Sequence, residues 1–238
     1  MNKKISRIFV KKEYLNVTYP LNSKANSYPK KLVSYLVAKY IKKPGKLLDI
    51  GMGRGDHLGE FLKLGFDSFG IDISPVPSKN QYRENYILCN LEDHFLPFSN
   101  ESFDFIFCKS VIEHLNNVEN MLFEIKRILK ANGKAIIMTP SWMHTYWGPF
   151  YLDHTHITPF TQVSLENILS IVGFKKICVE EFYQIPILWS YPFLYYFFYL
   201  FSYLPLPYRP LRKIAWSEKF NKVIRFSKEV MLLACVEK

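Results

Sequence analysis

The chain has 238 residues, of which 49% are hydrophobic and 22% are charged. This balance supports a large buried core and excludes a wholly disordered or collagen-like protein. Two values are unusual, a net charge of +10 and an aromatic content of 17%, and neither is spread evenly along the chain.

Charge divides the chain into three parts. Residues 1–46 carry 12 Lys and Arg against one acid, residues 47–183 carry 11 against 17, and residues 184–238 carry 8 against 3. A nucleic-acid-binding domain usually has a basic surface interleaved with aromatic residues. Here the central part is acidic, and the 27 uncharged residues from 182 to 208 hold 13 aromatics. We therefore expect no nucleic-acid partner, and an uncharged aromatic run with basic flanks favours contact with an anionic membrane surface.

The cysteines and the N-terminal residues indicate the compartment. The four cysteines are widely spaced and form no disulfide framework of the kind that small secreted proteins use. The N-terminal stretch is basic, but its apolar piece is only three residues long, too short for a signal peptide. We expect a cytoplasmic protein, associated peripherally with the inner face of the membrane.

Helical and strand patterns alternate along the chain. Helices are predicted over 28–41, 56–64, 116–130 and 161–172, and strands over 46–50, 67–73, 86–89, 103–108, 134–139, 174–182 and 228–236. This order predicts an α/β protein with a Rossmann-like, doubly wound, mostly parallel seven-stranded sheet and an antiparallel last strand. We expect one domain over 1–238, with a basic helical region (1–45), a cofactor-binding core (46–183), a hydrophobic aromatic helical insert (184–226) and the last strand (227–238).

The loop after the first predicted strand, Gly51-Met-Gly-Arg-Gly55, indicates the class of ligand. In an open α/β sheet, ligands bind outside the carboxyl ends of the strands, and glycines let them approach the backbone. Asp49 and Asp56 flank this loop, and acids at a helix N-terminus disfavour a pyrophosphate. Asp72 ends the second strand at the spacing where an acid accepts hydrogen bonds from ribose hydroxyls. Ribose with a cationic group and no phosphate describes S-adenosylmethionine.

At this point the sequence resembles the class I S-adenosylmethionine-dependent methyltransferases, in the branch that modifies small molecules, quinones and cell-surface glycans. Four blocks carry the resemblance, and they lie in residues 47–55, 70–73, 89–104 and 128–140. It covers about residues 30–183 and the last strand, and leaves residues 1–25 and 182–226 outside. The resemblance implies an enzyme with S-adenosyl-L-methionine as its cofactor.

The resemblance also assigns contacts to the methionine and ribose parts of the cofactor. It implies that Gly51 and Gly53 pack against the methionine part, and that Asp49 holds the amino group. Asp72, with Ile73 after it, would take the ribose hydroxyls. Two structural alternatives stay open: the glycines serve only tight packing, and Asp49 serves only as a helix cap.

The adenine contacts that the resemblance implies are less regular. Asn90 stands where many relatives have an acid that accepts from the adenine amino group. The Leu91 amide would serve adenine N1, and the backbone of Lys109 would line the cofactor.

Two stretches are candidates for acid–base chemistry on the acceptor. His114 follows the fourth predicted strand and titrates near neutrality, so it is a candidate base, with a packing role as the alternative. In the loop at 151–159, His154 beside Asp153 is a candidate base with its orienting acid. The alternative there is a capped helix start with Thr161 as the N-cap.

Four residues in and near this loop could in principle bind a metal ion. His144, Asp153, His154 and His156 have ligand chemistry, but their spacing is not diagnostic of any metal ion. We therefore expect no metal.

The aromatic insert is apolar, uncharged over most of its length and rich in proline. Residues 185–206 are long enough to span a bilayer, but Pro186, Pro192 and Pro205 and the many tyrosines disfavour a spanning helix. We expect interfacial helices over 185–222 that use nearby basic residues as anionic-lipid contacts: Arg209, Arg212, Lys213, Lys219 and Lys222. The alternatives are a lid over an apolar acceptor and a homodimer interface.

These observations lead to one favoured function and two rivals. The favoured function is S-adenosylmethionine-dependent O-methylation of a lipid-linked saccharide or a similar amphiphilic acceptor at the cytoplasmic membrane face. One rival is a soluble small-molecule methyltransferase, acting on a quinone-like compound or a natural product, whose insert is a lid or a dimer interface. The other is a scaffold that keeps the cofactor fold without turnover.

Overall fold

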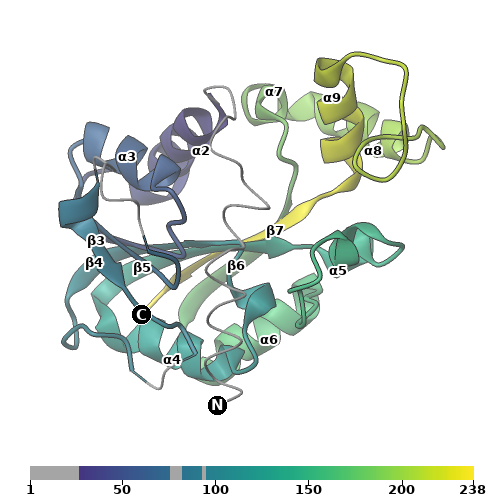
Figure 1. The fold of residues 1–238 in the computed structure, drawn as a ribbon. Helices are drawn as coiled ribbons and strands as arrows, with labels where there is room; N and C mark the ends of the chain where they lie inside the picture. Colours follow the sequence, from purple (N-terminus) through teal and green to yellow (C-terminus); the bar gives the residue numbers. More distant parts are fainter. Residues whose placement is uncertain (1–26, 76–81, 93–94) are drawn as a thin grey trace.

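A seven-stranded sheet forms the centre of the molecule in the computed structural model, which describes residues 27–75, 82–92 and 95–238 (Figure 1). The strand order is β3-β2-β1-β4-β5-β7-β6. The strands are β1 Lys46–Ile50, β2 Asp67–Asp72, β3 Tyr86–Leu88, β4 Phe103–Lys109, β5 Leu129–Pro140, β6 Lys175–Phe182 and β7 Met231–Glu237. Strands β3, β2, β1, β4 and β5 pair in parallel, whereas β7 runs antiparallel to both β5 and β6. The predicted mostly parallel sheet with an antiparallel last strand is confirmed.

Helices cover both faces of this sheet. In Figure 1, α2, α3 and α7 to α9 lie on one side, and α4 and α6 lie on the other. The helices are α2 Tyr28–Leu36, α3 Asp56–Lys63, α4 Val118–Ile128, α5 Trp142–Thr145, α6 Gln162–Val172, α7 Pro186–Ser190, α8 Tyr195–Ser202 and α9 Glu218–Lys228. A π-helical turn over Val37–Ile41 extends α2, and 3-10 turns cover Arg83–Asn85, Ile112–His114, Pro149–Leu152 and Pro192–Leu194. Most of the predicted basic N-terminal region, residues 1–26, lies outside the described residues.

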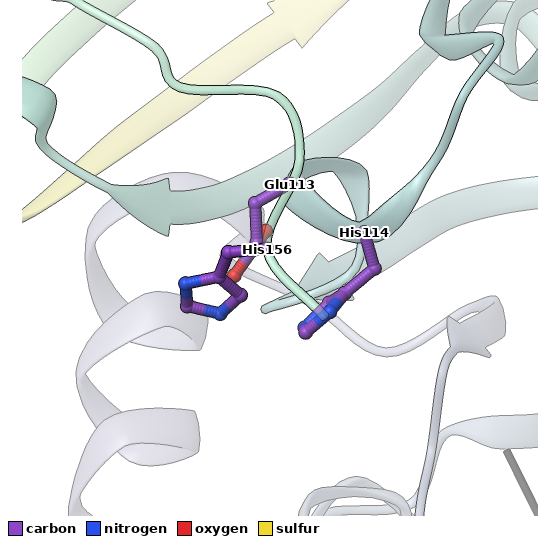
Figure 2. A group of neighbouring side chains, drawn as sticks. All are labelled: Glu113, His114 and His156. Atoms are coloured by element: carbon purple, nitrogen blue, oxygen red, sulfur yellow. The ribbon is translucent and has the colours of Figure 1, made fainter. Parts of the chain in front are cut away.

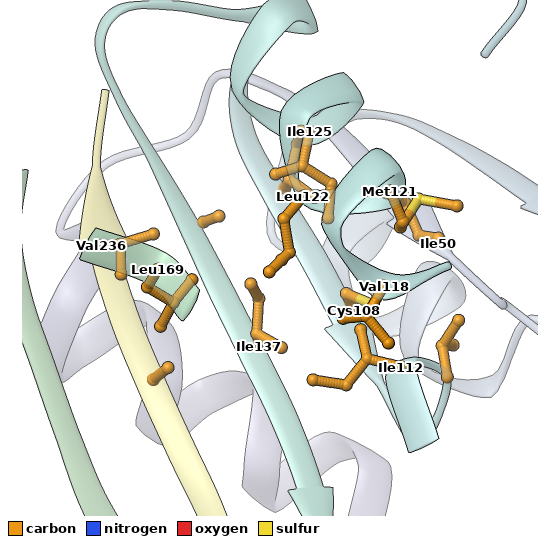
Figure 3. Packing of buried hydrophobic residues seen from close by; sticks show 14 of the residues in the cluster. Ile50, Cys108, Ile112, Val118, Met121, Leu122, Ile125, Ile137, Leu169 and Val236 are labelled. Carbon is orange, nitrogen blue, oxygen red and sulfur yellow. The ribbon is translucent and has the colours of Figure 1, made fainter. Parts of the chain in front are cut away.

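Apolar side chains at helical spacing pack each helix onto the sheet. Leu122 and Ile125 of α4 and Leu169 of α6 contact Ile137 and Val236 on one face (Figure 3). On the other face, α2 and α3 pack against β1, β4 and β5. Burying each of these side chains contributes about 1.5–3 kcal/mol. The sheet is therefore held between two apolar layers, and its carboxyl edge is built from loops.

Two predicted strand boundaries were wrong by three residues or more. The last strand begins at Met231 rather than at 228, because the buried face of α9 continues through Ile224 and Ser227 and carries the helix to Lys228. Strand β5 begins at Leu129 rather than at 134, and the helix predicted over 116–130 ends at Ile128, because Leu129 already pairs with Phe103 before a bulge in the ladder.

The aromatic insert starts at the same edge of the sheet as the predicted site. Pro140 at the end of β5 and Phe182 at the end of β6 both pair with Met231. The insert is anchored there by Trp189 of α7, whose ring stacks on Phe182 at 5.2 Å and meets the ring of Tyr28 at 5.9 Å. Loops after β1, β2, β4, β5 and β6 therefore meet at one edge, as a ligand site in an open α/β sheet requires.

Candidate active site

The glycine loop between β1 and α3 is held against β2. Gly51 has a φ of +73°, and a Cβ at this position would lie 2.3 Å from Cγ2 of Val111. Gly53 has a φ of +56°, and its amide donates to Oδ2 of Asp72 at 2.9 Å. Positive φ values and a close neighbour leave these two positions to glycine. The loop backbone therefore stays open toward the edge of the sheet.

Asp72 lies where the sequence predicts it, at the end of β2. Its Oδ1 accepts from the Ser74 amide at 2.7 Å, and only 8% of the residue is exposed. Burial raises the pKa of this carboxyl, while the amides of Ser74 and Gly53 oppose that rise. A carboxylate held by two backbone amides is fixed in orientation and keeps lone pairs for ribose hydroxyls. Ile73, the next residue, is half-buried.

Asp49 makes a helix-capping contact and also keeps one buried oxygen without a partner among the described residues. The Leu58 amide in the first turn of α3 donates to the Asp49 carboxylate, which is a capping contact. Among the described residues, Oδ2 of Asp49 is buried without a hydrogen-bond partner. Burial and the charge of Asp72 raise the pKa of Asp49 well above its usual value. A buried carboxylate oxygen without a donor fits the ammonium group of S-adenosylmethionine.

The predicted adenine contacts lie on the loop after β3. Oδ1 of Asn90 accepts from the Glu92 amide at 3.3 Å, which closes a short turn. Leu91 is partly buried against the core on the α4 side. Their roles toward adenine stay predictions.

Lys109 ends β4 and has a side-chain role that the sequence did not reveal. Its ammonium acts electrostatically on both Asp49 and Glu113. Burial lowers the pKa of Lys109, and the charges of Glu113 and Asp49 oppose that fall. Lys109 therefore connects the cofactor side of the edge to a second group of polar residues beyond β4.

This second group consists of Glu113, His114 and His156, which we call the acceptor-side cluster (Figure 2). One ligand atom from each residue lies within 4.8 Å of the other two, and the two imidazole rings are 4.6 Å apart. Glu113 is fully buried, and burial is the main cause that raises its pKa to about 7. Its Oε2 accepts from Oγ1 of Thr139 at 3.0 Å.

Main-chain hydrogen bonds hold the loop after β5 over the turn after β4. The amides of Ile157 and Thr158 donate to the Glu113 carbonyl at 2.9 and 3.0 Å. Oγ1 of Thr158 donates to the Leu115 carbonyl at 3.0 Å. These bonds bring His156 beside His114, although 42 positions separate them in the chain.

Asp153 orients His114 through Thr155. Oγ1 of Thr155 donates to Oδ1 of Asp153 at 2.6 Å and lies 2.8 Å from Nδ1 of His114. Because the hydroxyl proton goes to Asp153, we assign the proton of this second contact to Nδ1 of His114. The predicted pairing of Asp153 with His154 needs correction, because the carboxylate closes a turn onto Thr155 and His154 is exposed.

Two other expectations for this loop are resolved. His144 lies apart from the cluster, where its Nε2 contacts Oε1 of Glu181 on β6 at 2.8 Å. The four residues considered as metal ligands from the sequence, His144, Asp153, His154 and His156, therefore do not lie together as one group. Thr161 is the N-cap of α6 and forms a capping box with Ser164, as the structural alternative predicted.

The fold and the site together match a class I methyltransferase: the glycine loop, Asp72 and Asp49 lie at the carboxyl edge of a mostly parallel sheet with an antiparallel last strand. A family model described as a methyltransferase domain matches residues 21–179, so the chain belongs to this family. It is an S-adenosylmethionine-dependent enzyme, and the predictions of its fold, its cofactor and its catalytic class are confirmed.

Known relatives give the range of its similarities. A demethylmenaquinone methyltransferase from Tropheryma whipplei is 29% identical over 145 residues, which cover 59% of this chain and 61% of that protein. An Archaeoglobus fulgidus SAM-dependent methyltransferase structure has a TM-score of 0.58 at 20% identity, and covers 88% of this chain and 94% of its own.

A Burkholderia thailandensis 1,6-didemethyltoxoflavin-N1-methyltransferase, solved with bound 1,6-didemethyltoxoflavin and S-adenosylhomocysteine, has a TM-score of 0.62 at 16% identity. It covers 99% of this chain and 89% of its own. These two structures share the fold. The chain spans about three fifths or less of the length of the curated relatives it matches.

Proposed function

We propose that this enzyme methylates an oxygen of a small amphiphilic acceptor, such as a quinone-like compound or a lipid-linked saccharide, at the cytoplasmic membrane face. The observation that carries the proposal is the acceptor-side cluster beside the cofactor residues, bordered by exposed aromatic side chains. When bound, S-adenosylmethionine supplies an electrophilic methyl group on its sulfonium.

The chain's residues would divide the work at this edge. Asp72 would bind the ribose and Asp49 the ammonium group, which would hold the cofactor at the edge that ends at the turn after β4. His114, oriented by Thr155 and Asp153, would take the proton of the acceptor hydroxyl. The acceptor oxygen would then receive the methyl group, with S-adenosylhomocysteine as the second product.

Exposed apolar side chains support an apolar acceptor. The loop after β5 exposes Met143, Tyr146, Trp147 and Tyr151, each between 49% and 61%. The Trp147 ring lies 6.3 Å from the ring of Tyr208 in the insert. The insert therefore packs against this loop through the buried Tyr208. The loop reaches the cluster through Phe150, whose ring lies 5.1 Å from Tyr151 and 4.8 Å from His156. Exposed apolar side chains so close to the cluster fit an amphiphile better than a fully polar acceptor.

Helix α8 supports contact with a lipid surface. Its eight residues are Tyr-Tyr-Phe-Phe-Tyr-Leu-Phe-Ser and include no buried residue, with Tyr196 exposed to 73% and Leu200 to 67%. The basic residues predicted to meet anionic lipid are all exposed: Arg209, Arg212, Lys213, Lys219 and Lys222. Within the described residues, no helix has the length and apolar character needed to cross a bilayer. An amphipathic segment lying on the headgroups matches this composition.

The chemistry is tested by methyl transfer to extracted lipids. With labelled S-adenosylmethionine, we expect label in the organic phase of a membrane-lipid extract or on a short-chain demethylated quinol. His114→Ala is expected to lower kcat by roughly 100- to 10,000-fold, because a positioned base is lost. The matched control is His154→Ala, an exposed histidine on the neighbouring loop. Label found only on water-soluble compounds would support the soluble rival, and equal losses in the two variants would contradict the role of His114.

Membrane contact is tested by co-sedimentation with vesicles of phosphatidylglycerol and phosphatidylcholine. Leu200→Glu is expected to weaken binding by roughly 10-fold or more, because it removes an apolar contact with the lipid and adds repulsion from anionic headgroups. Ile171→Glu on α6 is the control, since Ile171 is exposed to 71% and lies across the sheet from the insert. Absence of binding at low salt, or dimers that Leu200→Glu dissociates, would favour the lid or the dimer interface instead.

A further inference from the structure

We propose that Glu113, His114 and His156 form a binding site for one divalent transition-metal ion at the acceptor end of the active site. This inference deepens the proposed function, on which it rests, by assigning an ion that holds the acceptor oxygen. It concerns residues that the sequence did not group together, because Glu113 was not among the predicted site residues.

The three residues have the ligand chemistry of such a site. Two imidazoles and one carboxylate suit Zn²⁺, Mn²⁺ and Fe²⁺, and catalytic sites of this composition keep open positions for water or substrate. Ligand atoms around such an ion lie about 3–3.5 Å apart, since each bond is about 2.0–2.2 Å long. The ligand atoms lie within 4.8 Å of one another, so they would have to approach by about 1–2 Å when an ion binds.

An unpaired buried oxygen is the second, independent observation. Glu113 is 0% exposed, and within the described residues its Oε1 is buried without a hydrogen-bond partner. The Thr139 hydroxyl holds the other oxygen, so the carboxylate has a fixed orientation. A buried anionic oxygen is unfavourable unless a cation or a donor meets it. A metal ion between the carboxylate and the two rings provides that cation.

Both histidines are oriented as metal ligands usually are. Nδ1 of His156 contacts the Phe150 carbonyl at 2.7 Å, and Nδ1 of His114 contacts Thr155, which is itself bonded to Asp153. Such outer contacts from one ring nitrogen to a carbonyl or a carboxylate fix the ring and direct the other nitrogen to the ion. In this arrangement, Nε2 of each histidine is the ligand atom.

The local charge also accommodates a divalent ion. The carboxylates of Glu113 and Asp153 act on each other electrostatically, and Lys109 is the cation that acts on Glu113. Glu113 and Asp153 therefore place two acidic groups close to the proposed ion. A bound ion would lower the pKa of an acceptor hydroxyl placed in its open position. With the ion present, His114 is a ligand and the ion, rather than His114, promotes loss of the proton.

The test is calorimetric titration of the full chain, freed of metal with EDTA, with ZnCl2 and separately with MnCl2. We expect one ion per chain, and at least a tenfold loss of affinity in Glu113→Gln and in His156→Ala. The matched controls are His154→Ala and His144→Ala, which remove histidines outside the cluster. Thr155→Val, which removes only an outer contact, is expected to lower the affinity by roughly 10- to 100-fold.

S-adenosylmethionine binding, measured on the same samples, separates this inference from the proposed function. The inference is supported if the cluster variants lose the ion, keep cofactor binding and unfold at the wild-type temperature. It is overturned if no ion binds, or if His154→Ala weakens binding as much as His156→Ala. If no ion binds while methyl transfer in EDTA still depends on His114, the proposed base stands without a metal.

Discussion

Replacement of Asp72 by alanine is expected to lower the affinity for S-adenosylmethionine about 100-fold, equivalent to about 2.7 kcal/mol. Two effects combine in this loss. The ribose hydroxyls lose a charged acceptor, and hydrogen bonds to charged groups contribute about 1.5–3 kcal/mol. The Gly53 amide also loses the carboxylate that holds the glycine loop against β2.

The measurement is calorimetric titration of S-adenosylmethionine into each variant. Asp67→Ala provides the control, because Asp67 is the exposed first residue of the same strand and lies at its opposite end. We expect the control to bind like the unmodified chain. A similar loss of affinity in both variants would indicate general damage to β2, and full affinity in Asp72→Ala would remove the ribose role.

The sequence predicted the positions of Asp72 and the glycine loop in the fold, because local pattern determines them. Asp72 is the last residue of a strand, and Gly51 lies in the loop that directly follows one, so strand periodicity alone places both at the carboxyl edge. Their partners are also close, since the Gly53 amide reaches Asp72 across neighbouring parallel strands. A hydrophobic pattern that fixes strand order therefore fixes these contacts too.

The acceptor side could not be predicted in the same way. In the sequence, Glu113 is one acid in a turn. Only the structure shows that it is buried beneath a loop more than 40 positions away, where it meets two histidines. Thr155 carries no signal in the sequence, yet its hydroxyl links His114 to Asp153. Asp153 and His154 are neighbours in the chain, but a turn aims the carboxylate two residues further on. Such contacts follow from the path of an irregular loop, which no residue spacing encodes.

The aromatic insert shows a third situation. Its composition predicted interfacial helices, and α8 has the exposed apolar side chains that such a helix needs, with no buried residue. Its position could not be read from composition, because it depends on the alignment of Pro140 and Phe182 against Met231 in the sheet. That alignment places the insert beside the acceptor loop, so its apolar surface and the chemical site are joined by topology.

Asp49→Asn is expected to stabilise the cofactor-free protein at pH 8 and to weaken S-adenosylmethionine binding at the same time. Burial and the charge of Asp72 raise the pKa of Asp49. The folded chain therefore holds a proton at pH values where the unfolded chain has lost it, and folding stability decreases as pH rises from the usual Asp pKa to the raised one. A neutral amide removes this penalty and leaves the shape of the side chain unchanged.

We expect a gain of about 1–3 kcal/mol in the free energy of unfolding at pH 8, the range for an unsatisfied buried polar group. The gain should shrink at pH 5, where the native carboxyl is more often protonated. The affinity for S-adenosylmethionine should decrease by roughly 10- to 100-fold, because the ammonium group loses a charge-assisted hydrogen bond. Thermal unfolding at the two pH values and calorimetric titration of the cofactor measure both effects.

A variant that loses stability at pH 8 would show that the carboxylate is needed as the cap of α3, whereas unchanged affinity would show that the cofactor's ammonium group binds elsewhere. Opposite changes in stability and affinity are expected only if this buried acid is retained for its ligand.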